Sequence, residues 1–331
     1  MEFKKTPETF FVEEILQPQL WEGKYYYYIL EQKGLGTDKA LKILETENNT
    51  KIYSSGLKDA QATTKQCICS ETQLKTTNSE MQLKFIGNSA KKIFFGMHTA
   101  NKFKILFGKT NEIEEKFLKE KTGKIIYPNY FDEQRFSAKT IQLGEHLKNK
   151  EWEKATKSAL TDYSEKESEE SKRIKKTILK NWEKWENLSK EEIPEPKKKI
   201  FLFLAENADY QEAILLLDKK TVRQGIRAMQ AFEFNRKLKE QILKQKSRVQ
   251  KNITINSEEF PILFKLKGIK RKLFIEKIYP YGKALERSTF FKTKNAKTKL
   301  KGNICTLEFE LKKGSYATIL IKTLQKLAEN N

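Results

Sequence analysis

The spacing of apolar residues changes twice along this chain. Before about residue 140, apolar residues alternate with polar ones or form short aromatic runs, as at 10–15 and 25–30, which is typical of strands. Over 151–190 and 222–243 they recur at every third or fourth position, which is typical of amphipathic helices. Alternation returns at 307–311. The chain is therefore predicted to be α+β, with strand-bearing ends around a helical middle.

Local signals place smaller elements within the two ends. Thr37 is predicted to be a helix N-cap, because Ala40, Leu41 and Leu44 follow it at helical spacing. A helix with one apolar face is expected after Ser315. An insertion inside a parent domain explains this organisation, and two sequential domains would explain it as well. Further strands are predicted at 51–54, 66–70, 83–85 and 103–107, and a further helix at 111–121.

The chain has 65 Lys and Arg against 44 Asp and Glu, a net charge of +21 over 331 residues. This surplus indicates a polyanionic partner, and because the lysines are spread along the whole chain, nucleic acid is favoured over an anionic membrane. A lysine-rich proteome is the alternative explanation. No apolar run approaches the roughly 20 residues that span a bilayer, and the N-terminus lacks a signal-peptide pattern, so a cytoplasmic protein with no membrane partner is expected.

Few residue patterns in the chain are suited to metal or cofactor chemistry. The histidines, His98 and His146, are far apart and have no cysteine or acidic cluster at ligand spacing. Cys67 and Cys69 fall on one face of a predicted strand, where buried thiols are more common than reactive ones. The two glycines of Lys33–Thr37 lack the rest of a phosphate-binding motif. Neither a metal nor a small-molecule cofactor is expected.

The remaining candidate for chemistry is the loop from Gly56 to Gln66. It places Asp59 between Lys58 and Lys65 in the sequence, and a carboxylate near cations keeps the charge that a nucleophile or a base requires. From the residues alone, a helix cap or a turn is the more common role for such an aspartate.

This loop resembles the signature of the TruD family of tRNA pseudouridine synthases, G-x-K-D-x-x-A-x-T-x-Q. Further blocks resemble the family in chain order, so the resemblance covers nearly the whole chain. The matching residues are Gly56, Lys58, Asp59, Ala62, Thr64 and Gln66 in the signature, and 10–15, 101–103, 129–136, 227–235 and 314–318 outside it. The departures are Gln32, Gly36, Gly108, Ala228 and Ser137, which stand where the family often has Lys, Asn, Arg, Ser and Gly.

The resemblance implies a pseudouridine synthase catalytic domain with a mixed, mainly antiparallel sheet. Residues 1–140 and 265–331 would form it, interrupted by an α-rich TRUD insertion domain at 141–264. The implied reaction isomerises a uridine in tRNA, typically at position thirteen of the D-arm, to pseudouridine. It includes no redox step or group transfer, so no cofactor is expected, and a monomer is expected. The alternative is a non-catalytic RNA-binding protein on the same scaffold, which would not need Asp59.

The resemblance also implies roles for individual residues. Asp59 matches the catalytic aspartate, which would attack the sugar or the base or remove a ribose proton. Lys58 would keep Asp59 ionised or contact a phosphate; a solvated loop lysine is the alternative. Asn101 would hydrogen-bond the target base, and Phe103 would stack on it, although an alternating strand also suits Phe103 to the core. The remaining implied contacts, to RNA or backbone and at the rim of the site, are those of Asn129, Gln134, Arg135, Glu14 and Thr37.

Overall fold

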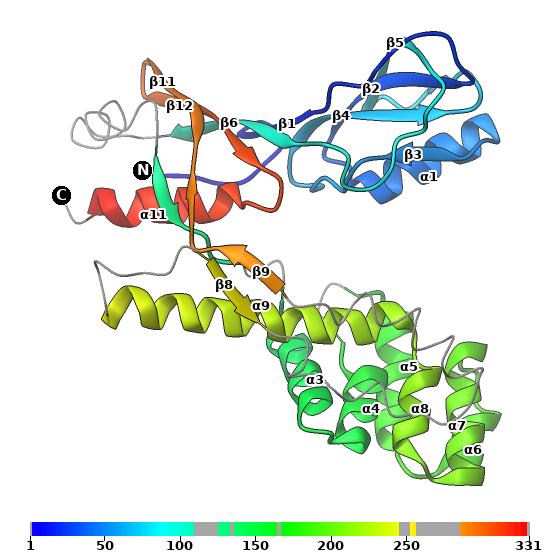
Figure 1. Cartoon of the computed structure of the whole chain (residues 1–331). Coiled ribbons are helices and arrows are strands. Elements are labelled where there is room, and N and C mark those ends of the chain that lie inside the picture. The colour runs from blue at the N-terminus through cyan, green and yellow to red at the C-terminus, as the bar shows by residue number, and fades with distance from the viewer. Residues whose placement is uncertain are drawn as a thin grey trace. The chain divides into compact units, whose positions relative to one another are not determined.

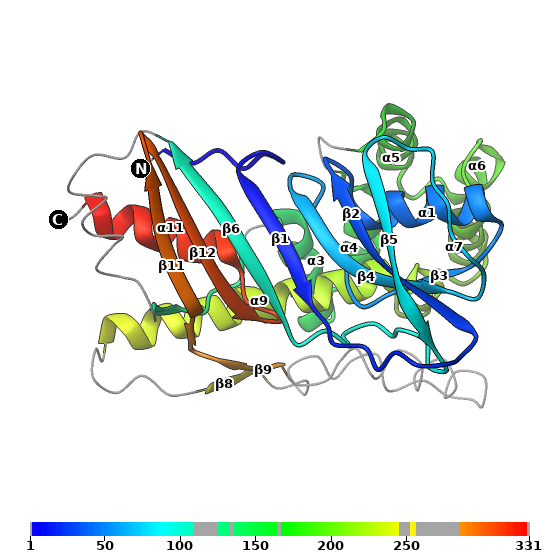
Figure 2. The same cartoon turned by 90° about the horizontal axis from the view of Figure 1, so that it is seen from above.

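The alternating segments at the two ends of the chain pair into one sheet, which Figure 2 shows from above. Among the described strands only β1 and β4 pair in parallel, so the sheet is mixed and mainly antiparallel, as predicted. In the part of the chain that the structure describes, the eight strands run in the order β11 (Lys294–Lys301), β12 (Ile304–Lys312), β6 (Ala100–Gly108), β1 (Phe10–Ile15), β4 (Thr63–Ser70), β2 (Tyr25–Lys33) and β5 (Met81–Ser89), with β3 (Ile52–Ser54) paired to β4.

The structure is a computed structural model that describes residues 2–108, 125–132, 136–163, 167–244, 252–255 and 285–329. These residues form two compact units, Met1–Asn129 with Phe290–Asn331, and Tyr130–Thr289. The first unit therefore contains both ends of the chain. The domain boundaries at 140 and 265 stay a prediction, and residue 265 and the helix expected at 111–121 lie outside the described residues.

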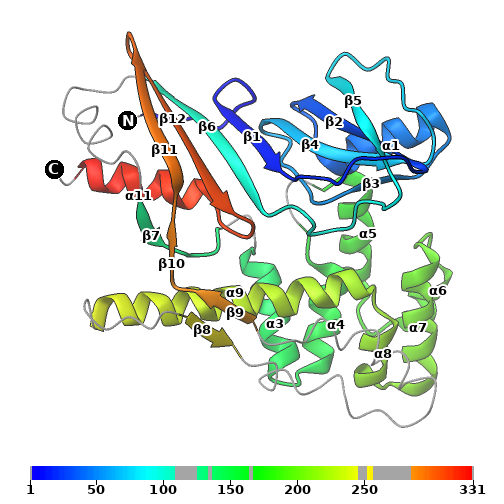
Figure 3. The same cartoon turned by 45° about the horizontal axis from the view of Figure 1, so that its top comes forward.

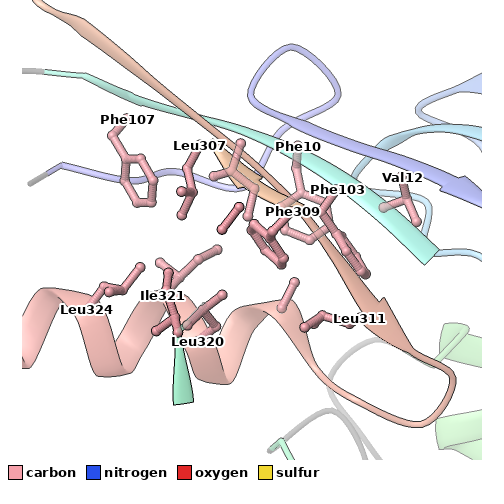
Figure 4. Close-up of a cluster of buried hydrophobic side chains, with 14 of the residues drawn as sticks. Phe10, Val12, Phe103, Phe107, Leu307, Phe309, Leu311, Leu320, Ile321 and Leu324 are labelled. Atoms are coloured by element: carbon pink, nitrogen blue, oxygen red, sulfur yellow. The ribbon is translucent and has the colours of Figure 1, made fainter. Parts of the chain in front are cut away.

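Helices α1 (Thr37–Asn48) and α11 (Ala317–Glu329) cover one face of the sheet of the first unit (Figure 1). Under α11 an apolar cluster forms, because alternate residues of β1, β6 and β12 point to this face (Figure 4). A second cluster lies under α1 and includes Leu30, Leu44 and Ile68. The covered face thus has two apolar regions, one for each helix.

On the opposite face of the same sheet, Glu13 of β1 and the side chains beside it on the neighbouring strands are polar. The register places Glu13 opposite Lys102 on one side and Lys65 on the other, and Lys65 forms an ion pair with Glu31. Further along β4, Cys67 and Cys69 lie in a separate apolar cluster. Burial raises the pKa of Cys67 to about 12 and that of Cys69 to about 11, so both thiols stay protonated and serve the core.

The middle of the chain forms the second, helical unit (Figure 3). The stretch 151–190, which the spacing predicts as one amphipathic helix, instead contains three separate helices, α4 (Trp152–Thr161), α5 (Glu169–Lys180) and α6 (Trp185–Lys190); Glu183, between α5 and α6, has a positive φ of 72°. Trp182 and Trp185 pack on this unit's core, as predicted, with their ring centroids 4.9 Å apart. Its helices are α3 (Ala138–Lys148), α4 (Trp152–Thr161), α5 (Glu169–Lys180), α6 (Trp185–Lys190), α7 (Glu195–Asn207), α8 (Tyr210–Leu216) and α9 (Lys219–Lys244).

Glycines bring α3 and α9 close together in this unit. A Cβ on Gly144 would lie 2.3 Å from the carbonyl oxygen of Gly225, so the two backbones meet where neither residue has a side chain. The unit also contains the pair β8 (Asn252–Ile255) and β9 (Leu285–Ser288), whereas β7 (Ile126–Pro128) pairs with β10 (Phe290–Lys292) in the first unit. In the described part of the chain, no helix combines the length and the apolar character that crossing a membrane requires.

The predicted N-cap is displaced by one residue. Gly36 is the N-cap of α1 and makes no side-chain cap bond, and Thr37 is the first helical residue. The hydroxyl of Thr37 instead accepts a hydrogen bond from the backbone N–H of Lys58, at 2.8 Å. The Thr37 hydroxyl, which was expected to cap the helix, is therefore engaged by a residue 21 positions away in the sequence.

Candidate functional site

A band of buried polar side chains separates the two apolar clusters on the helix-covered face. Strand register puts Asn101 opposite Glu14, and Thr64 beside both Val12 and Gln32. Among the described residues, seven buried side-chain atoms have no hydrogen-bond partner, and four of them lie in this band: Glu14 Oε1, Gln32 Oε1, Thr64 Oγ1 and Asn101 Oδ1. Unpaired buried acceptors cost free energy, so their concentration at one place indicates where a polar ligand binds.

The loop that follows β3 is joined to this band by an ion pair. Lys58 Nζ lies 2.6 Å from Glu14 Oε2, and the two side chains are 6% and 0% exposed. The backbone of Lys58 is held as well, since its N–H donates to Thr37 Oγ1 at 2.8 Å. Gln66 Nε2 also donates to Thr37 Oγ1, at 3.1 Å. Glu14, Thr37 and Lys58, all predicted at the site, are thus brought together.

His98 and Ser55 complete the support of this loop. Ser55 Oγ lies 2.7 Å from His98 Nδ1, which is 3.8 Å from Glu14 Oε2. Burial, and secondly the positive charge of Lys58, hold the pKa of His98 below its ordinary value, so the ring is neutral near pH 7. A Cβ on Gly56 would lie 3.1 Å from His98 Cε1, so the ring packs closely against the start of the loop.

Asp59, next to the buried lysine, is more accessible. Its side chain is 33% exposed and forms an ion pair with Lys5, whose side chain is 14% exposed. Its Oδ1 accepts a hydrogen bond from the backbone N–H of Gln61 at 2.9 Å, so the carboxylate is oriented as in an Asx turn. A charged and oriented carboxylate therefore lies at the surface, beside a loop that is fixed to the polar band.

Asn101 and Phe103 lie on the same face of β6, two residues apart. Asn101 is the partner of Glu14, and its Oδ1 is buried and unpaired. Phe103 lies at the edge of the apolar cluster, where its ring stacks on Phe309 with centroids 5.4 Å apart and meets Phe10 edge-on (Figure 4). Phe103 is only 7% exposed, so its role in stacking on a base stays a prediction.

The other predicted residues lie further along the chain. Asn129 is buried directly after β7, at the end of the first unit. Gln134 and Arg135 lie outside the described residues. In the second unit, Asn235 joins two of the blocks on which the family resemblance rests: its Oδ1 accepts from the N–H of Phe131 at 2.8 Å, and its Nδ2 donates to the carbonyl of Phe131 at 2.9 Å.

Lys5, Ser55 and His98 are the residues that sequence reasoning missed. Lys5 is 54 residues from Asp59, and nothing in its surroundings in the sequence marks it. From the sequence, His98 suits neither a metal site nor a Ser-His-Asp arrangement, and the described residues contain no group of three or more His, Cys, Asp or Glu that could hold a metal ion. What the site offers is therefore an oriented carboxylate, a buried ion pair and unpaired polar acceptors.

Three comparisons with known proteins point to one family. The family model of tRNA pseudouridine synthase D (TruD) matches residues 1–262. A protein assigned as tRNA pseudouridine synthase D in Nanoarchaeum equitans is 30% identical, over 91% of this chain and 87% of its own length. One assigned as tRNA pseudouridine synthase D 2 in Methanocaldococcus jannaschii is 28% identical, over 97% and 91%.

Among solved structures, the crystal structure of a protein assigned as TruD from Methanosarcina mazei superposes with a TM-score of 0.65. The two chains are 21% identical, and the match covers 98% of this chain and 93% of the other. At this identity, the likeness establishes the fold.

Proposed function

This chain belongs to the TruD family of tRNA pseudouridine synthases, and we propose that it converts one uridine of a transfer RNA to pseudouridine with Asp59 as the catalytic carboxylate. Membership of the family makes the protein an isomerase. The observation that carries the proposal for Asp59 is its place in the site. It is an accessible, oriented carboxylate in the signature loop, and Glu14, Lys58 and Thr37 anchor that loop.

The proposed reaction rearranges bonds within one nucleotide. The bond from N1 of uracil to C1′ of ribose breaks, the base turns, a bond from C5 to C1′ forms, C5 loses its proton and N1 takes one up. A carboxylate can start this sequence by attack on the sugar, by attack on the base or by removal of a ribose proton. Lys5 beside Asp59 favours the charged form that each of these steps requires. Atoms and electrons balance without an added reactant.

The unpaired acceptors of the polar band suit the uracil ring. Uracil has one N–H donor, N3–H, once N1 is bonded to the sugar, and carbonyl acceptors on either side of it. We propose that the amide of Asn101 accepts from N3–H and donates to a neighbouring carbonyl. We propose that Phe103, two residues along β6, stacks on the extruded base, which requires the base to displace part of the packing around this buried ring.

Loop anchoring is the proposed role of the buried pair. Lys58 is bonded to Glu14 and is only 6% exposed, which favours a role in holding Asp59 in place over a contact to phosphate. We therefore propose Lys58, Glu14 and Thr37 as positioning residues. Asn129, Gln134 and Arg135 remain proposed RNA or backbone contacts.

Within transfer RNA, we propose the uridine at position thirteen of the D-arm as the target, the position that the family typically modifies. The proposed place of action is the cytoplasm, where the substrate is found, and the proposed active form is a monomer. Mapping pseudouridine in transfer RNA from host cells with and without the gene tests the position. Sedimentation of the enzyme with and without transfer RNA tests the oligomeric state.

Replacing the proposed catalytic carboxylate tests the function. Asp59→Asn keeps the shape of the side chain and removes its charge, so release of tritium from C5-labelled transfer RNA should be abolished, with RNA affinity within a few-fold of wild type. The matched control is Glu71→Gln, the same chemical change in an exposed ion pair with Lys24, which should leave turnover unchanged. An Asp59→Asn variant that kept a tenth of the wild-type rate would count against Asp59 as the essential group, whereas a wild-type protein that binds RNA and forms no pseudouridine would favour the non-catalytic alternative.

A further inference from the structure

Two adjacent phenylalanines project from the loop between β5 and β6. Phe94 is 62% exposed and Phe95 is 74% exposed. No large hydrophobic side chain in the described part of the chain is more exposed than Phe95. Single exposed apolar residues are common on proteins, but two neighbouring aromatic rings in water leave a large apolar surface that a partner can bury.

The loop holds these two rings outward, because it is tied to the protein on both sides of them. Before them, Ile93 is buried and its N–H donates to Cys69 Sγ at 3.2 Å. At the rings, the N–H of Met97 donates to the carbonyl of Phe94 at 3.1 Å, and Gly96 has a φ of +86°. A glycine with positive φ at the third position is what a type II turn requires. Phe95 therefore lies at the tip of a fixed turn.

This turn is bonded directly to the residue that precedes the signature loop. The N–H of Gly96 donates to the carbonyl of Ser55 at 2.6 Å, and Lys313 Nζ donates to the carbonyl of Gly96 at 2.7 Å. Ser55 also holds His98, which faces Glu14. The two rings are therefore held on the framework that positions Asp59.

The surroundings of the rings are basic. From Met81 to Gly108 the sequence contains five lysines and no aspartate or glutamate. Lys91 and Lys92 are exposed and are separated from the turn by the buried Ile93, and Lys92 Nζ lies 4.9 Å from the centroid of the Tyr53 ring. Aromatic rings with interleaved lysines are the combination that binds single-stranded nucleic acid, because every base has a flat π face and every nucleotide a phosphate.

We propose that Phe94 and Phe95 form a stacking platform for RNA bases next to the target uridine, with Lys91 and Lys92 contacting the adjoining phosphates. The proposal rests on the proposed function, since it takes RNA as the occupant. Extrusion of one uridine leaves its neighbours unstacked, and a ring held beside the site restores part of that stacking. The platform would keep the RNA open while the uridine reacts.

Equilibrium binding to unmodified transfer RNA tests the platform separately from turnover. Phe94→Ala/Phe95→Ala should raise Kd about 5- to 150-fold, the equivalent of ~1–3 kcal/mol. Phe95→Trp should bind at least as well as wild type, and Phe95→Leu should lose affinity, because leucine keeps the apolar volume without the flat ring. Lys91→Ala should reduce the dependence of log Kd on log salt by about one, whereas the double alanine variant should leave that slope unchanged.

Ile304→Ala is the matched control. Ile304 is 48% exposed and pairs with Gly108, seven residues along β6 from Asn101, which is about 23 Å. Its Kd should equal that of wild type. A direct probe is 2-aminopurine placed beside the target uridine, whose fluorescence should be quenched on binding to wild type and to Phe95→Trp.

Two results would overturn the platform. One is a double alanine variant that binds within twofold of wild type; the other is equal quenching of 2-aminopurine by Phe95→Leu and wild type. Thermal melts check the fold of each variant. If the Tm of the double alanine variant is well below that of wild type, the comparison of Phe95→Leu with Phe95→Trp tests the platform in its place. Failure of the proposed function looks different, because the wild type would then form no pseudouridine whatever its affinity for RNA.

Discussion

Lys58→Met should destabilise the protein far more than an ordinary lysine substitution. The change leaves Glu14, whose side chain is 0% exposed, without the cation at 2.6 Å, and Glu14 Oε1 has no partner already. Removing one member of a buried ion pair costs about 3–5 kcal/mol. The first unit has about 170 residues, for which each kcal/mol lowers Tm by about 2–4 °C, so we expect a fall of roughly 6–20 °C.

A double-mutant cycle isolates the ion pair from other effects of the substitution. Glu14→Leu/Lys58→Met replaces both charges with apolar side chains, and buried pairs treated in this way are often neutral or more stable. The double variant should therefore be at least about 2 kcal/mol more stable than the sum of the two single changes indicates. Urea unfolding followed by far-UV circular dichroism at pH 7 measures all four proteins. A loss below 1 kcal/mol for Lys58→Met, or additive single changes, would refute the view that the pair anchors the loop.

Three further predictions follow from the described contacts. Burial first, and then the charge of Lys58, lower the pKa of His98 from its ordinary 6.5, against the opposing effect of Glu14. The contribution of neutral His98 to stability is therefore present above about pH 6.5 and is lost as the pH falls below it. Between pH 7 and pH 5, the Tm of His98→Asn should fall less steeply than that of wild type, and equal slopes would contradict the lowered pKa. Phe103→Leu should reduce single-turnover rates more than RNA affinity, whereas unchanged turnover with a lower Tm would leave Phe103 only its place in the core. Asn235→Ala removes both hydrogen bonds to the backbone of Phe131 and should cost about 1–3 kcal/mol in urea unfolding; Asn207→Ala, at an exposed helix end, is the control, and equal losses would count against the bridge.

Much of the fold could be predicted because its signals are local. Alternation at 10–15 and 307–311 places β1 and β12, and the spacing from Val222 onwards places α9. Errors arose where a distant contact overrode a local preference. Thr37 has the chemistry of an N-cap, but its hydroxyl accepts a hydrogen bond from the backbone N–H of Lys58. A local break was also missed: the predicted helix at 151–190 is three helices, and the positive φ of Glu183 lies between α5 and α6.

The residues of the candidate site also fall into those that a local motif marks and those that only tertiary contacts bring together. The predicted loop residues Lys58 and Asp59 are consecutive, so one motif could mark both of them. Lys5, by contrast, contacts Asp59 only because the fold packs the segment before β1 against the loop that follows β3. Asn101 faces Glu14 only because β6 pairs with β1 in a particular register, and a shift of one residue would turn either side chain to the other face.

The sequence by itself determined the α+β class, the strand and helix periods, the basic charge and the signature loop around Asp59. Each of these depends on residues that are close together in the chain, and their preferences do not require a partner. The tertiary structure alone decided which cation meets Asp59, that Lys58 is buried against Glu14, and that Phe94 and Phe95 are held outward beside them. Such contacts join residues tens of positions apart, and they form only when strand register and loop closure bring those residues together.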